Sequence, residues 1–216
     1  MTEFFSRDQW GARDPKPGPG ALDPLTVRGI ALHWPGMSGP LQGVERVSAA
    51  LRSWQAYHMD DRGWSDLAYQ QIVDQDGNRY QGRGLGVKSG ANGDEFTNDV
   101  YGACLLVLAP GEPPSAAMVR TVRNVITRHR ALFVNSRRVV GHGQIRPGGT
   151  ECPGAMVQKY IDAGKFEPRP PWTPVVLRRR VTRALAEAEA APDKTPGIDA
   201  TRRRLSRILF RLEGGK

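Results

Sequence analysis

The sequence has few cysteines and no long apolar run, and each of these absences excludes a class of protein. It contains two cysteines in 216 residues, Cys104 and Cys152, too few for the disulfide framework of a small secreted domain. No window reaches the roughly 18 consecutive apolar residues of a membrane span. The first residues, MTEFFSRDQW, carry charges and lack the apolar core of a signal peptide. We therefore expect the protein to stay in the compartment where it is made.

Acidic residues are scarce relative to basic ones. The chain has 31 Lys and Arg against 22 Asp and Glu, a net charge of +9. Residues 175–216 hold eleven basic and five acidic residues, so this segment carries +6 and the first 174 residues only +3. The prolines of 168–174 predict an extended linker. We expect a domain over 1–167, a linker over 168–174 and a basic tail over 175–216.

Two stretches of the tail show helical spacing of apolar residues, which predicts a C-terminal helical hairpin with basic outer faces. The apolar positions are Leu177, Val181, Leu185 and Ala188 in the first stretch, and Leu205, Ile208, Leu209 and Leu212 in the second. The hairpin either packs on itself or on the main domain, or binds an anionic surface such as an envelope polymer or a membrane. No nucleic-acid motif accompanies the basic residues, so nucleic acid is the least favoured partner.

Strand and helix patterns alternate before the linker, which predicts an α/β fold with a central mixed β-sheet flanked by helices. An Asp-Gly pair inside 67–82 indicates a β-hairpin. Apolar strands are expected over 29–34, 101–110 and 137–143, and helices over 47–60 and 113–133, the second with Ser115 as its N-cap. Cys104 lies in an apolar strand and is expected in the core.

Two of the four histidines each end an apolar strand. His33 and His142 take these positions, and Cys152 follows ten residues after His142 across a Gly-rich segment that can fold back. Two imidazoles and one thiolate would suit zinc and leave a fourth position open for water. We interpret His129, between two arginines, as a surface residue, and His58, at the end of a helix, as structural.

Four segments, in order, resemble the zinc-dependent N-acetylmuramoyl-L-alanine amidases of the type 2 family, which includes peptidoglycan recognition proteins and phage amidases. They are SRDQWGARDP (6–15), ALHWPG (31–36), HMDDRGWSDLAYQQIVDQDGNRYQGRG (58–84) and VVGHGQIRPGGTECPG (139–154). The resemblance extends over roughly residues 6–166. It implies the fold of this family for the main domain.

The resemblance also implies roles for individual residues. His33, His142 and Cys152 would bind Zn2+, Tyr69 stands where catalytic members hold a tyrosine near the reacting water, and Thr150 stands where they hold a lysine or threonine facing the open site. The chain departs from the family pattern at Ala68, in place of a common glycine. It departs again at Gln70 and Gln71, in place of an aromatic or histidine-containing pair. None of these departures removes a metal ligand.

The activity that the resemblance implies is hydrolysis of the amide bond between N-acetylmuramic acid and L-alanine in peptidoglycan. The expected protein is a monomeric phage endolysin that accumulates in the host cytoplasm and reaches the cell wall after holin-type release. One alternative is a non-catalytic module that recognises peptidoglycan. Another is a zinc-stabilised structural protein on an unrelated fold.

Overall fold

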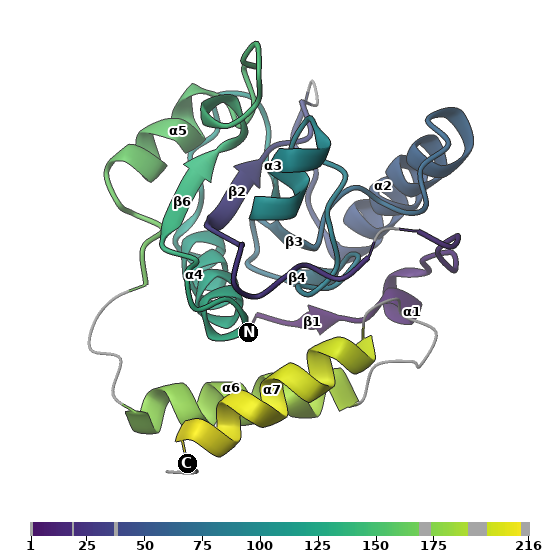
Figure 1. Ribbon diagram of the computed structural model, residues 1–216. Coiled ribbons are helices and arrows are strands. Elements are labelled where there is room, and N and C mark those ends of the chain that lie inside the picture. The colour runs from purple at the N-terminus through teal and green to yellow at the C-terminus, as the bar shows by residue number, and fades with distance from the viewer. Residues whose placement is uncertain (1, 19, 37–38, 169–173, 190–197, 213–216) are drawn as a thin grey trace.

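A six-stranded sheet forms the centre of the molecule, with strand order β1-β4-β3-β5-β2-β6 (Figure 1). The computed structural model describes residues 2–18, 20–36, 39–168, 174–189 and 198–212. Neighbouring strands run parallel except β3 and β4, which form the predicted Asp-Gly hairpin. The α/β class with a mixed sheet is confirmed. The strands are β1 (Phe4–Phe5), β2 (Gly29–His33), β3 (Gln71–Asp74), β4 (Arg79–Gln81), β5 (Tyr101–Val107) and β6 (Arg138–Gly141).

Helices cover both faces of this sheet. The two long helices of the domain agree with the predicted ranges, and the second begins after Ser115, whose side chain accepts a hydrogen bond from the Met118 N–H. None of the helices in the described part of the chain combines the length and apolar composition that a membrane crossing needs. The helices are α1 (Arg7–Trp10), α2 (Val44–Ala56), α3 (Glu95–Val100), α4 (Ala116–Leu132), α5 (Ala155–Asp162), α6 (Pro174–Glu189) and α7 (Ile198–Leu212).

The central strand β5 shows why the sheet needs cover on both sides. Cys104 and Leu106 point to the face that packs against α4 and α5, while Leu105 and Val107 point to the face covered by α1 and α2. All seven residues of the strand are buried. The largely apolar composition of 101–107 therefore reflects a strand covered on both faces, and Cys104 lies in the core as expected.

The C-terminal helices α6 and α7 pack on each other and against α4. Val181, Ala188 and Leu205 of the hairpin are buried together with Leu132 and Phe133 at the end of α4. The predicted helical hairpin is thus docked on the main domain. The side chains of Leu177 and Leu212 and most of the predicted linker, 169–173, lie outside the described residues, as does the segment 190–197 between the helices.

The interpretation of His129 as a surface residue is wrong. The side chain is fully buried between α4 and β5, and its ring lies where a Cβ on Gly102 would stand. Helical spacing explains the burial, because Val122, Val125 and Ile126 lie on the same inward face of α4. The flanking arginines point to other faces of the helix and carry no information about residue 129.

Candidate metal centre

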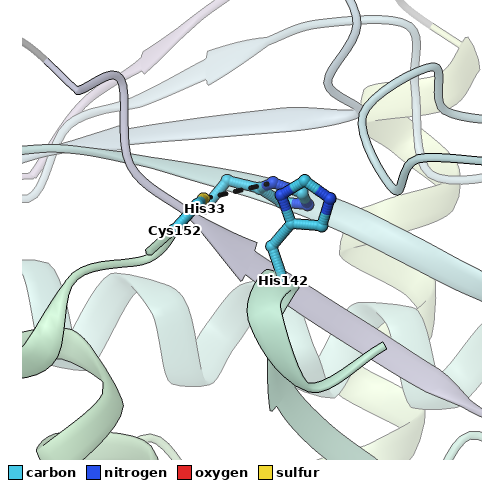
Figure 2. Close-up of side chains that lie close together, drawn as sticks. All are labelled: His33, His142 and Cys152. Carbon is cyan, nitrogen blue, oxygen red and sulfur yellow. Dashed lines mark hydrogen bonds between the residues drawn. The ribbon is translucent and has the colours of Figure 1, made fainter. Parts of the chain in front are cut away.

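His33, His142 and Cys152 converge at one edge of the sheet (Figure 2), where one ligand atom from each lies within 4.8 Å of the others. Strand pairing brings the two histidines together. Leu32 of β2 pairs with Gly141 of β6 in parallel register, so His33 at the end of β2 and His142 just after β6 lie side by side. The two imidazole rings lie 4.5 Å apart between centroids. The histidine at the end of each strand is therefore brought to one point by the sheet itself.

The loop after His142 folds back and returns Cys152 to the histidines. The Gly143 N–H donates a hydrogen bond to the Cys152 carbonyl at 2.7 Å, which closes the loop. A Cβ on Gly143 would stand 2.5 Å from the carbonyl oxygen of Thr150, so only glycine allows the two segments to approach this closely. The Cys152 sulfur then lies 3.7 Å from Nδ1 of His33.

A buried asparagine that sequence reasoning missed orients His33. Asn92 is fully buried, and its Nδ2 donates to the side chain of Ser89 and the carbonyl oxygen of Tyr101, so its Oδ1 faces His33 Nε2 at 3.0 Å. His33 thus carries its proton on Nε2, and the lone pair of Nδ1 faces Cys152. Nothing around "GANGD" in the sequence signals this role.

Burial keeps both imidazole rings uncharged. It lowers the pKa of His33 to about 3, and the neighbouring His142 adds to this effect, while the hydrogen bond that His33 donates to Asn92 opposes it. The pKa of His142 is lowered by burial and by the Arg146 charge, against a hydrogen bond with the Asn92 backbone. Both rings are therefore neutral at pH 7, which is the form that binds metal.

The three side chains fit zinc. His142 Nε2 is buried without a hydrogen-bond partner among the described residues, so its lone pair is available to a ligand. The 3.7 Å between the Cys152 sulfur and the His33 nitrogen is close to the roughly 3.6 Å expected for two such ligands on tetrahedral zinc. Burial raises the pKa of the Cys152 thiol to about 11. A bound cation would reverse that effect and favour the thiolate.

Tyr69 lies beside this centre. Its ring meets the His33 ring edge-on at 5.4 Å between centroids, and the side chain is half-buried. Burial, with a smaller contribution from Cys152, raises the pKa of the Tyr69 phenol well above its usual range. The phenol therefore stays protonated at neutral pH and is able to donate a hydrogen bond.

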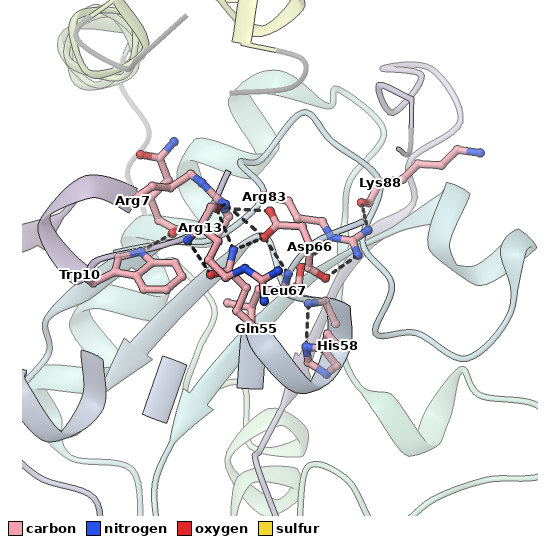
Figure 3. Close-up of polar contacts among 12 residues, drawn as sticks. Arg7, Trp10, Arg13, Gln55, His58, Asp66, Leu67, Arg83 and Lys88 are labelled. Atoms are coloured by element: carbon pink, nitrogen blue, oxygen red, sulfur yellow. Dashed lines mark hydrogen bonds and ion pairs between the residues drawn. The ribbon is translucent and has the colours of Figure 1, made fainter. Parts of the chain in front are cut away.

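A buried polar network holds the segment that leads into Tyr69 (Figure 3). The Asp66 carboxylate accepts hydrogen bonds from Arg7 at 2.8 Å and Gln55 at 2.7 Å. The Arg83 guanidinium donates to three backbone carbonyl oxygens, including that of Leu67 at 2.6 Å. These bonds fix the backbone immediately before Tyr69 from both sides.

His58 and Trp64 form an aromatic wall next to Tyr69. The His58 ring stacks on Trp64 at 4.9 Å and lies 6.2 Å from Tyr69, and its Nδ1 accepts a hydrogen bond from the Ala68 N–H. The hydrogen bond with Ala68 agrees with the structural role predicted for His58. The sequence analysis did not place His58 near the metal centre. A π-helical turn, Tyr57–Asp61, follows α2 and carries His58 there.

Thr150 is half-buried in the loop that carries Cys152. Its hydroxyl accepts a hydrogen bond from the Cys152 N–H at 3.3 Å. The hydroxyl therefore supports the backbone of the cysteine. Its predicted contact with the reacting group stays a prediction.

Known proteins similar to this chain share the fold. Peptidoglycan-recognition protein LB of Drosophila melanogaster is 29% identical over 164 residues, which cover 75% of this chain and 68% of the relative. Human N-acetylmuramoyl-L-alanine amidase is 31% identical over 156 residues, which cover 68% of this chain but only 26% of the relative. No protein-family model matches the chain.

Two solved structures extend the comparison. Wild-type Drosophila PGRP-LB superposes with a TM-score of 0.67 at 25% identity, covering 80% of this chain and all of that one. PGRP-LE, solved in complex with tracheal cytotoxin, a monomeric diaminopimelic acid-type peptidoglycan, gives 0.66 at 25% identity over 77% of this chain and 96% of that one. The fold is that of the peptidoglycan recognition proteins. The chain is thus similar in sequence and fold to peptidoglycan recognition proteins, and in sequence to an N-acetylmuramoyl-L-alanine amidase.

Proposed function

We propose that the protein hydrolyses the amide bond between the lactyl group of N-acetylmuramic acid and L-alanine in peptidoglycan. The observation that carries this proposal is the meeting of His33, His142 and Cys152 at 4.8 Å or less, with the Tyr69 phenol beside them. The names of the relatives support it, since one is an N-acetylmuramoyl-L-alanine amidase and one neighbour was solved with a peptidoglycan fragment.

The metal ligands and Tyr69 have separate roles in the proposed hydrolysis. We assign zinc to His33, His142 and Cys152; when bound, zinc polarises water and carbonyl groups for amide hydrolysis. Negative charge grows on the carbonyl oxygen as the amide carbon becomes tetrahedral, and a donor placed there lowers the barrier. Tyr69 supplies such a donor, because its phenol is protonated and lies against His33.

The test combines metal content with product analysis. Purified protein should contain zinc and should release new N-terminal alanine from purified cell walls. Cys152→Ala should abolish both. Cys104→Ala is the matched control, because its thiol packs in the core against α4 and is not one of the three candidate ligands, so zinc and activity should stay in place. Zinc without new alanine termini would favour the peptidoglycan recognition module instead of the amidase.

We further propose that the protein serves as a phage endolysin, made in the host cytoplasm and released to the wall through a holin-type membrane lesion. The test is to produce the full chain inside bacteria with and without a co-expressed holin. Lysis should require the holin. Lysis at the same rate without it would contradict the proposed route to the wall.

A further inference from the structure

A polar cavity of about 310 Å³ lies between the C-terminal hairpin and the main domain. Its size is at the lower end of the range for ligand pockets in proteins. Arg79 of β4 and Arg128 of α4 line it from the domain, and Arg179 and Arg183 line it from α6. The cavity is separate from the metal centre. Strands β2 and β6 point away from α6 and α7, and the metal centre lies at the ends of these strands (Figure 1).

The cavity holds more positive than negative charge. Among the described residues, its lining contains four arginines but only two acidic residues, Glu187 and Glu3. The Glu187 carboxylate accepts from Arg79 at 2.9 Å, from Arg128 Nη2 at 2.9 Å, and faces Arg183 at 3.4 Å. One carboxylate is therefore shared by three guanidinium groups, and the lining has a surplus of two positive charges.

Two of these guanidinium groups are poorly hydrated. The side chains of Arg79 and Arg128 are 11% and 15% exposed. Burial and the charge of Arg128 lower the pKa of Arg79 to about 10, the direction expected where like charges crowd together. Arginine binds phosphate in a bidentate manner, and a guanidinium that has lost water gains more from such an anion.

We propose that this cavity binds a phosphate group, held by Arg179 and Arg183 of the hairpin together with the guanidinium groups of the domain. At neutral pH a phosphodiester carries one negative charge and a phosphate monoester close to two, and neither exceeds the positive surplus of the lining. Arg179 and Arg183 lie one helical turn apart on the same face of α6, so both reach one anion. The inference is independent of the proposed amidase activity, because no residue of the metal centre takes part.

Titration calorimetry with sodium phosphate, at ionic strength held constant with sodium chloride, tests the proposal on the full chain. We expect saturable binding of one phosphate per chain. The double variant Arg179→Ala/Arg183→Ala should weaken binding at least tenfold. Both side chains are exposed, 77% for Arg183, so the fold should survive, as circular dichroism would verify.

The matched control is Arg203→Ala/Arg207→Ala, which removes the same charge from exposed positions of α7 that are not among the described residues lining the cavity. It should bind phosphate within about twofold of the wild type. Equal weakening in both double variants would mean that general positive charge, not this cavity, attracts the anion. That result, or the absence of saturable binding, would overturn the proposal.

A second titration identifies the source of the phosphate. A soluble polyglycerol phosphate is compared with inorganic phosphate at equal phosphate concentration. Tighter binding of the polymer, lost in Arg179→Ala/Arg183→Ala, assigns the cavity to the phosphodiester of an envelope polymer. Equal or weaker binding of the polymer assigns it to free phosphate.

Discussion

At the scale of single residues, the centre depends on side chains whose protonation is set by burial. Tyr69 is the clearest case, since its phenol lies against His33 and keeps its proton. Asn92 has a similar effect on His33 by holding the ring proton on Nε2. The chemistry of this site therefore depends on neighbours that are distant in the sequence.

Replacing Tyr69 tests its role as a donor. Tyr69→Phe should lower turnover on cell walls by about 10²–10³-fold, the usual effect of losing one donor to the growing negative charge. Zinc content should not change, because the phenol is not a ligand. Metal analysis beside a rate assay checks both. Wild-type lysis by this variant would show that Tyr69 has no part in the reaction.

The burial of His129 predicts that the stability of the fold depends on pH. Burial lowers its pKa to about 3, against about 6.5 in the unfolded chain. Between these values the unfolded state takes up a proton that the folded state does not, so stability falls as the pH drops from about 6.5 towards 3.

His129→Leu should reduce this loss by up to about 1.4 kcal/mol per pH unit. Urea unfolding at several pH values between 7 and 4 measures the slope for both proteins. The comparison uses slopes, because the substitution also removes the 2.9 Å contact with Ser136 and lowers stability at every pH. Identical slopes would show that His129 does not titrate in this way.

At the scale of elements, one carboxylate of α6 adds ion pairs with the domain to the apolar contacts of the helix. Glu187 is 23% exposed and pairs with Arg79 and Arg128, which belong to β4 and α4. The partners of Glu187 lower the pKa of its carboxyl group despite burial, so it is ionised at neutral pH. Removing it leaves two poorly hydrated guanidinium groups without their shared partner.

Glu187→Ala should therefore destabilise the protein by on the order of 3 kcal/mol. Glu189→Ala is the matched control, two residues away on the same helix but exposed, and should change stability by less than about 0.5 kcal/mol. Urea denaturation measures both. A loss of the same size in the two variants would show that this ion pair does not hold the hairpin in place.

At the scale of the whole molecule, the hairpin and the metal centre occupy different ends of the domain (Figure 1). The hairpin covers an apolar surface formed by Leu22, Val27, Leu132 and Phe133. Its apolar face is thus used within the molecule, while Arg203 and Arg207 are exposed and Arg179 and Arg183 line the cavity.

Deleting residues 174–216 should expose that apolar surface. We expect a loss of about 3 kcal/mol or more, a fall in Tm of roughly 6–12 °C, with increased aggregation. Activity on soluble peptidoglycan fragments, measured below the Tm, should remain, because the residues described at the centre all belong to the domain. Thermal unfolding and light scattering measure the first effect. A truncated protein as stable as the full chain would show that docking contributes nothing.

The sequence by itself indicated the longer strands and helices and the three candidate ligands, but not the short elements β1, α1, α3 and α5. Apolar strands, an Asp-Gly turn and helical spacing are local signals. The position of a histidine at the end of each of two apolar strands can also be read directly from the sequence. Only the tertiary structure decided the pairing of Leu32 with Gly141, the burial of His129, the placement of Asn92 and His58 near the centre, and the arginine-lined cavity. These depend on contacts between segments far apart in the chain, and the free energy of such contacts comes from burial and desolvation that no local pattern records.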